Sequence, residues 1–209
     1  MNILKIQDGN PIEYSESRLK KDNPQISFPK PLNATVLADF DCYIYTIDPT
    51  PQYNETLQYV QQKFEERDTG WVRAWDVIDF AEDDAKNRLK SEVASDRWDM
   101  EQDGVEWLDA NFDTWLIATD ENSQIKMTSV LSVLTANPSF NGYSNWKTQK
   151  KVGDDWETQF RQTTLEEYNE IITLVSTHIE KCFRAEANCY AKIDSGDLTV
   201  TFQSEYDNL

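Results

Sequence analysis

The chain has 209 residues, of which 38 are acidic and 20 basic, so its formal net charge at pH 7 is −18. Binding to nucleic acid or to an anionic membrane surface requires clustered Lys and Arg, so this charge argues against both as partners. No continuous apolar run reaches the length of a signal peptide or a membrane-spanning helix. We therefore expect neither membrane insertion nor export by a signal peptide.

The aromatic content is high for so acidic a chain, with seven Trp, nine Tyr and nine Phe. Such a chain is not disordered, because its aromatic residues must form a packed core or an aromatic interface. The length suits two unequal modules. We predict an α+β fold, with an N-terminal β-rich docking module over residues 1–78 and an α+β domain over residues 79–209.

The N-terminal module is predicted to be a small antiparallel β meander. Residues 3–6 form a possible first strand, which a turn at 8–11 ends, and short helical segments follow at 14–23 and 36–40. Residues 42–47, 58–65 and 71–78 are rich in β-branched and aromatic side chains and are separated by prolines or turn residues. Three antiparallel strands joined in sequence are the simplest arrangement of these segments.

The last of these strands carries the candidate protein-contact residues. Trp71, Arg73 and Trp75 lie two positions apart, so they share one face of a strand with Val77. One interpretation is that the two indoles fill the hydrophobic side of a sheet with few strands. The alternative is that Trp71, Arg73 and Trp75 form a docking surface for another protein.

From Asp79 the period of the apolar residues becomes helical. A helix over about 79–103 carries a thin apolar stripe of Ala81, Ala85, Leu89, Val93 and Met100 among many charges. So weak a stripe is not typical of a core helix. The segment is either a solvated connecting arm or half of a helix pair completed by another copy.

The C-terminal domain is predicted to be mainly helical with short hairpins. Residues 105–108 and 112–118 suggest two short strands, and Asp120 caps a helix over about 121–136. Tyr143, Trp146, Lys147 and Trp156 suggest a last small hairpin, and residues 198–202 suggest a terminal strand.

A long helix over about 164–193 organises this domain. Its apolar residues recur in steps of three or four and describe one buried stripe. Two overlapping capping boxes mark its start, Thr163 with Glu166 and Thr164 with Glu167. The turn residues from Asp194 to Gly196 end it.

The residues for common catalytic and metal sites are missing. The single histidine, His178, excludes multi-histidine metal sites and is expected to be a hydrogen-bonded histidine in the core or at its boundary. The three cysteines form no metal-binding motif and suggest reduced thiols in a cytosolic setting. No glycine-rich phosphate loop and no calcium-loop spacing occurs. We predict no catalytic residues, no metal site and no cofactor.

Two stretches resemble proteins of the tail-fibre region of tailed bacteriophages and prophages. From Tyr14 to Tyr43 the chain contains Y-S, L-K-K-D-N-P-Q-I-S-F-P and L-A-D-F in order. In the tail proteins a similar segment precedes a small sheet with a glycine and two tryptophans, here Gly70, Trp71 and Trp75. One departure is Asp41, where such proteins often have glycine.

The second stretch, from about residue 86 to 193, is similar to an uncharacterised domain of phage tail-fibre and tail-associated proteins. The shared order is a charged helix, a short hairpin, a capped helix, the pair Trp146-Lys147, and an amphipathic helix with a central histidine, here His178. This resemblance brings no catalytic residues with it.

The resemblance implies a structural protein of a bacteriophage tail, an adaptor or fibre component of the baseplate or tail-fibre region. It would be made in the cytoplasm of the host bacterium and would reside in the virion tail. Its partners would be other tail, baseplate or fibre proteins, and it would form a homo-oligomer within the assembly. A non-virion chaperone of fibre assembly is the alternative, and a glycan-binding or hydrolytic fibre part is a weaker one, suggested by the abundant Trp, Asp and Glu.

Overall fold

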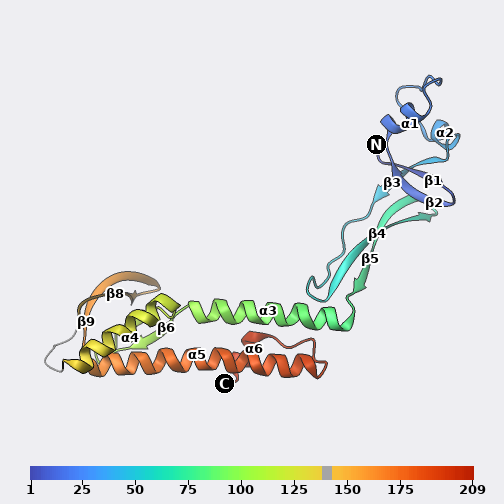
Figure 1. Cartoon of the computed structure of the whole chain (residues 1–209). Helices are drawn as coiled ribbons and strands as arrows, with labels where there is room; N and C mark the ends of the chain where they lie inside the picture. Colours follow the sequence, from blue (N-terminus) through green and yellow to red (C-terminus); the bar gives the residue numbers. More distant parts are fainter. Residues whose placement is uncertain (138–142) are drawn as a thin grey trace. The chain divides into compact units, whose positions relative to one another are not determined.

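The computed structural model of the chain describes residues 1–137 and 143–209, and of residues 143–146 it describes the backbone alone. The chain forms two compact units, residues 1–85 and 86–209, with a boundary a few residues beyond the expected 78/79 (Figure 1). Strands prevail in the first unit and helices in the second, which confirms the α+β prediction.

The first unit contains five strands and two short helices. They are β1 (Ile3–Gln7), β2 (Asn10–Tyr14), α1 (Glu16–Asp22), α2 (Ala34–Ala38), β3 (Cys42–Ile47), β4 (Gln58–Arg67) and β5 (Gly70–Asp79). The side chains of Ser15 and Asn33 cap the two helices by accepting hydrogen bonds from backbone N–H groups in the first turn.

The predicted antiparallel meander is wrong, because the strands form one five-stranded sheet in the order β2-β1-β3-β5-β4. β4 and β5 are an antiparallel hairpin, but β5 lies between β4 and β3 and pairs with β3 in parallel. The proline-containing connection over residues 48–57 is long enough to place β4 one position away from β3, so that β5 fits between them.

The core of the first unit lies between one sheet face and the two helices. Ile3, Tyr14 and Cys42 from the strands pack with Leu19 of α1 and Leu37 of α2. Asp41 lies in the turn between α2 and β3 and adopts a left-handed backbone with φ of 55°. Its carbonyl accepts a hydrogen bond from Ile6 N–H. This is the position where the resembling proteins often have glycine, the residue that takes such a conformation most readily.

The second unit combines three longer helices, a short one and a four-stranded sheet. The elements are α3 (Glu82–Gln102), whose first turn belongs to the first unit, β6 (Val105–Leu108), β7 (Thr114–Ile117), α4 (Glu121–Ala136), β8 (Tyr143–Val152), β9 (Asp155–Thr163), α5 (Leu165–Asp194) and α6 (Phe202–Asp207). The sheet is antiparallel in the order β6-β7-β8-β9. The structure confirms the helices expected at 121–136 and 164–193 and the two expected hairpins. The side chains of Tyr143 and Trp146, which suggested the last hairpin, are not among those the structure describes.

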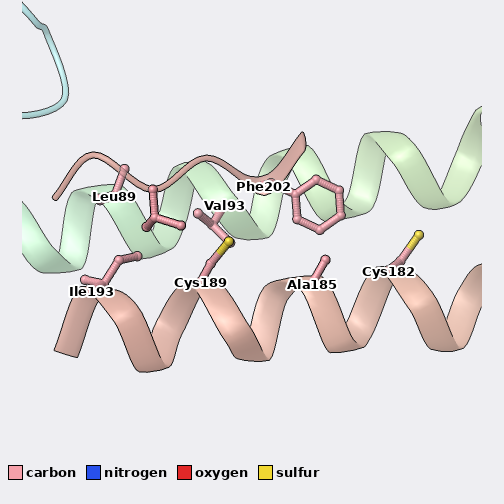
Figure 2. Packing of buried hydrophobic residues seen from close by; sticks show 8 residues of the cluster. Leu89, Val93, Cys182, Ala185, Cys189, Ile193 and Phe202 are labelled. Carbon is pink, nitrogen blue, oxygen red and sulfur yellow. The ribbon is translucent and has the colours of Figure 1, made fainter. Parts of the chain in front are cut away.

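The helix α5 runs through both hydrophobic clusters of this unit. Thr164 and Glu167 form the capping box, with both reciprocal hydrogen bonds present. The first half of α5 packs with Trp107 and Trp115 of the sheet and with α4. The second half packs with Leu89 and Val93 of α3, as Figure 2 shows.

Two expectations for this unit are wrong. The stripe of α3 is covered by α5 of the same chain, so α3 is neither a solvated arm nor half of a pair completed by another copy. Residues 198–202 form no strand. Phe202 packs against α3 and α5 (Figure 2), as does Val200. Thr201 caps α6 by accepting a hydrogen bond from Ser204 N–H. Alternating apolar residues here reflect burial in an extended segment rather than sheet pairing.

Candidate functional site

The structure brings the three predicted contact residues together on one face of β5. Trp71, Arg73 and Trp75 are all half-buried, while Val72 and Ala74, on the other face, are buried. In the parallel pairing Trp71 lies opposite Tyr45 of β3, and in the hairpin Arg73 lies opposite Phe64 of β4. This surface therefore continues across three strands.

Arg73 occupies the middle of this surface. Its guanidinium carbon lies 5.8 Å from the ring centroid of Tyr45 and 5.8 Å from that of Trp75, a cation–π arrangement on both sides. Arg73 also lies 3.8 Å from Glu13, whose carboxylate accepts a hydrogen bond of 3.1 Å from the Tyr45 hydroxyl. Burial, followed by this hydrogen bond, raises the pKa of Tyr45, which keeps the hydroxyl a donor.

The two indoles differ in their polar contacts. The Trp75 Nε1–H donates a hydrogen bond of 3.0 Å to the Asp48 carbonyl. The Trp71 Nε1 is buried and has no hydrogen-bond partner among the described residues. The Trp71 ring packs 6.1 Å from that of Tyr43. Both indoles therefore stabilise their own sheet, and their role in contacting a partner stays a prediction.

The helices of the first unit do not cover this face. Its α1 and α2 pack on the opposite face, with Ile3, Tyr14 and Cys42. At the margin of this face Ile47 and Val77 are 44% and 40% exposed, whereas Tyr45 within it is only 4% exposed. We call this surface the aromatic face and define it by Tyr43, Tyr45, Phe64, Trp71, Arg73 and Trp75.

Sequence reasoning missed the three residues that β3 and β4 contribute to the aromatic face, Tyr43, Tyr45 and Phe64. The Tyr45 and Phe64 rings meet edge to face at 5.0 Å. Alternation along β3 was a usable signal, since Tyr43 and Tyr45 share a face by period two. This alternation does not place Tyr43 and Tyr45 beside the indoles, because that placement depends on the parallel pairing of β3 with β5.

The second unit contains a buried charge cluster beneath the β6–β7 turn. The Arg161 guanidinium of β9 lies between the rings of Trp107 and Trp115, with its central carbon 4.7 Å from each centroid. It lies 3.1 Å from the carboxylate of Asp109 and 2.6 Å from that of Glu167. Asp109 also accepts a hydrogen bond of 2.9 Å from Trp115 Nε1–H.

The same carboxylate orders the turn itself. Asp109 accepts hydrogen bonds from the N–H groups of Asn111 and Asp113 at 2.9 and 3.0 Å. Burial disfavours its ionisation, but these bonds, the Trp115 indole and the Arg161 charge together lower the pKa of Asp109. Phe112 at the tip has φ of 64° and is 83% exposed, so a rigid turn presents one aromatic ring to solvent.

His178 is a structural residue, as the sequence predicted. Its ring is buried, and its Nε2–H donates to the Met100 carbonyl at 3.0 Å, because a carbonyl can only accept. Its Nδ1 therefore accepts from the Tyr206 hydroxyl at 2.7 Å, which attaches α6 to α5. Burial lowers the pKa of His178 and raises that of Cys182 to about 11, so the ring stays neutral and the thiol protonated.

The described residues contain no group of His, Cys, Asp or Glu side chains arranged to hold a metal ion. Within the same part of the chain, none of the helices combines the length and apolar character needed to cross a membrane.

Residues 84–207 match the profile of a family described as a domain of unknown function, DUF4376. The matched segment is more than half of the chain and coincides closely with the second unit. Comparison with curated proteins and with solved structures finds no significant match.

Proposed function

Because the chain belongs to the DUF4376 family, whose description assigns no activity, we propose its function from its surfaces and from the resemblance of its sequence to phage tail proteins. It is a structural protein of a bacteriophage tail, an adaptor in the baseplate or tail-fibre region that acts by protein–protein contacts. The first unit docks on a neighbouring tail protein through the aromatic face, and the second unit carries the next component.

The aromatic face is the observation that carries this proposal. It combines two indoles, an arginine and further aromatic rings, which are the side chains most enriched at the energetic centre of protein interfaces. Its Arg73 is already held between Tyr45 and Trp75, so little side-chain entropy is lost on binding. The half-exposed Ile47 and Val77 extend the apolar area around it.

Mass spectrometry of purified virions of the phage that encodes the chain, combined with chemical cross-linking, tests the assignment. We expect the chain in stoichiometric amounts, cross-linked through its first unit to a baseplate or fibre protein. If it occurs only in the soluble lysate, bound to unassembled fibre, the chain is an assembly chaperone instead.

Replacement of both Trp71 and Trp75 by Ala tests the face directly. We expect loss of binding to the cross-linked neighbour while far-UV circular dichroism retains the signal of α5. A Trp98→Ala variant is the matched control, since this indole of α3 is 51% exposed and lies outside the aromatic face. Full binding by a folded Trp71→Ala/Trp75→Ala variant would show that the face is only a structural part of the sheet.

A further inference from the structure

The strand β4 is an edge of the first unit's sheet that carries charged side chains but no backbone feature that blocks pairing. It is the last strand in the order β2-β1-β3-β5-β4 and is 10 residues long, without proline or glycine. The opposite edge, β2, has 5 residues and contains Pro11. Proteins commonly protect edges by shortness and by proline, so β2 is protected in a way that β4 is not.

Two backbone hydrogen bonds determine which residues of β4 face the free edge. Phe80 N–H donates to the Leu57 carbonyl at 2.9 Å, so odd-numbered residues of this strand bond toward β5. The carbonyl of Arg73, the residue opposite Phe64, accepts from Asp48 N–H on the β3 side instead. The N–H and C=O groups of Val60, Gln62, Phe64 and Glu66 therefore point away from β5.

We propose that two copies of the chain pair antiparallel through their β4 edges, with the twofold axis at Phe64. A symmetric antiparallel pair must place residues with outward backbone groups opposite one another, and an axis at an even-numbered residue makes the central pair a hydrogen-bonded one. An axis at Phe64 sets Phe64 opposite its own copy and Gln62 opposite Glu66 of the partner. Each of these pairs exchanges backbone hydrogen bonds.

The side chains favour this register. Lys63 lies opposite Glu65 of the partner, and by symmetry this opposite-charge pair occurs twice. Lys63 already lies 2.6 Å from Asp76 and 3.5 Å from Glu65 of its own chain, but an ammonium has three donors and can hold a third carboxylate. On the other face the two Phe64 rings meet at the axis, and Gln62 can donate to Glu66.

The neighbouring registers are less favourable. An axis at Glu66 sets Glu65 opposite Arg67 of the partner, but it also sets Glu66 opposite its own copy, and like charges directly opposite each other are destabilising. An axis at Lys63 or at Glu65 has the same defect, because it sets that charged residue opposite its own copy. An axis at Gln62 sets Lys63 opposite Gln61 and leaves no pair of opposite charges across the strands. Charge complementarity therefore selects the axis at Phe64.

This pairing deepens the proposed docking role but rests only on the geometry of the first unit. A twofold axis perpendicular to the sheet keeps the same faces of both copies on one side. Because Phe64 belongs to the aromatic face, the two aromatic faces join across the axis into one surface. A tail protein would then meet a doubled face whose centre is the Phe64 pair.

Single cysteine variants of the full chain test the register. In Phe64→Cys the two new Cα atoms are expected about 5.5 Å apart, within the range of a disulfide. In the matched control Gln62→Cys, on the same edge and face, they are expected roughly 14 Å apart along the strands, which is beyond that range. We expect a disulfide-linked dimer from Phe64→Cys under mild oxidation and at least tenfold less from Gln62→Cys. The native thiols are buried and give a low background in the unaltered chain.

Light scattering of the unaltered chain and of Gln62→Pro provides a second, independent measurement. Proline at residue 62 removes an outward N–H and leaves the hairpin bonds intact, whereas Gln61→Pro removes an N–H that bonds to β5. We expect a dimer whose Kd rises at least tenfold in Gln62→Pro without loss of the fold, because two intermolecular bonds disappear. A monomeric unaltered chain at all concentrations, or faster cross-linking of Gln62→Cys than of Phe64→Cys, would overturn the proposal.

Discussion

Removal of the Asp109 carboxylate should be among the most damaging changes in the second unit. Asp109 and Arg161 have side chains only 3% and 11% exposed, and they lie 3.1 Å apart. In Asp109→Ala, Glu167 is the carboxylate that still pairs with the Arg161 guanidinium. The Trp115 Nε1–H and the backbone N–H groups of the turn lose their acceptor. Breaking a buried pair in this way costs about 3–5 kcal/mol, a large part of the stability of a domain of this size.

Urea denaturation followed by tryptophan fluorescence and circular dichroism measures this loss. The matched control is Glu106→Ala on the same hairpin, where Glu106 lies 3.5 Å from Lys151 but both side chains are about half exposed. That change should lower the free energy of unfolding by less than about 1 kcal/mol. Similar losses in Asp109→Ala and Glu106→Ala would refute the reasoning, because the cost depends on burial and on the number of donors left without an acceptor.

Four positions provide the remaining predictions. Because the pKa of His178 is lower in the folded protein, the unfolded state takes up the proton at a higher pH than the folded state. The free energy of unfolding should therefore be highest above pH ~6.5 and should fall as the pH drops below that value, less steeply in His178→Gln. Urea midpoints between pH 5 and 8 measure this slope, and an unchanged slope would contradict it. Thr164→Ala should lower the free energy of unfolding by about 1 kcal/mol, because it removes the N-cap of α5. Thr163→Val should leave the free energy of unfolding unchanged or raise it, because the Thr163 Oγ1 is buried and has no hydrogen-bond partner in the described part of the chain. Asp41→Gly should raise the free energy of unfolding by up to about 1 kcal/mol and Asp41→Val should lower it, which thermal unfolding of both variants checks.

Local features of the chain were predictable because their causes are local. The apolar stripe of α5 and the cap of α4 by Asp120 depend on residues within a few positions of one another. Two overlapping capping boxes at Thr163 and Thr164 were equally compatible with the sequence. The structure selects Thr164, which forms the capping box, since Thr163 is buried at the end of β9 and its hydroxyl has no hydrogen-bond partner among the described residues.

The remaining features depend on which distant segments meet. The parallel pairing of β3 with β5 joins strands that are separated in sequence by β4 and the connection before it, and nothing in their alternation distinguishes this pairing from a meander. The stripe of α3 is too weak to identify its partner, which becomes clear only when Leu89 and Val93 are seen against α5. The Asp109–Arg161 pair joins residues 52 positions apart, and in a chain with 38 acids no single carboxylate is marked as buried.

The sequence left two roles open for the indoles of β5, core of a small sheet or docking surface, and their half-burial makes the two roles compatible. A fully exposed indole loses rotamer freedom when a partner binds, whereas Trp75 is already held by Asp48 and by the Arg73 guanidinium. The same contacts leave part of each ring accessible because α1 and α2 lie on the opposite face. A side chain that is ordered by its own sheet but not covered by it suits an interface anchor, so removal of Trp71 and Trp75 should weaken binding more than it weakens the fold.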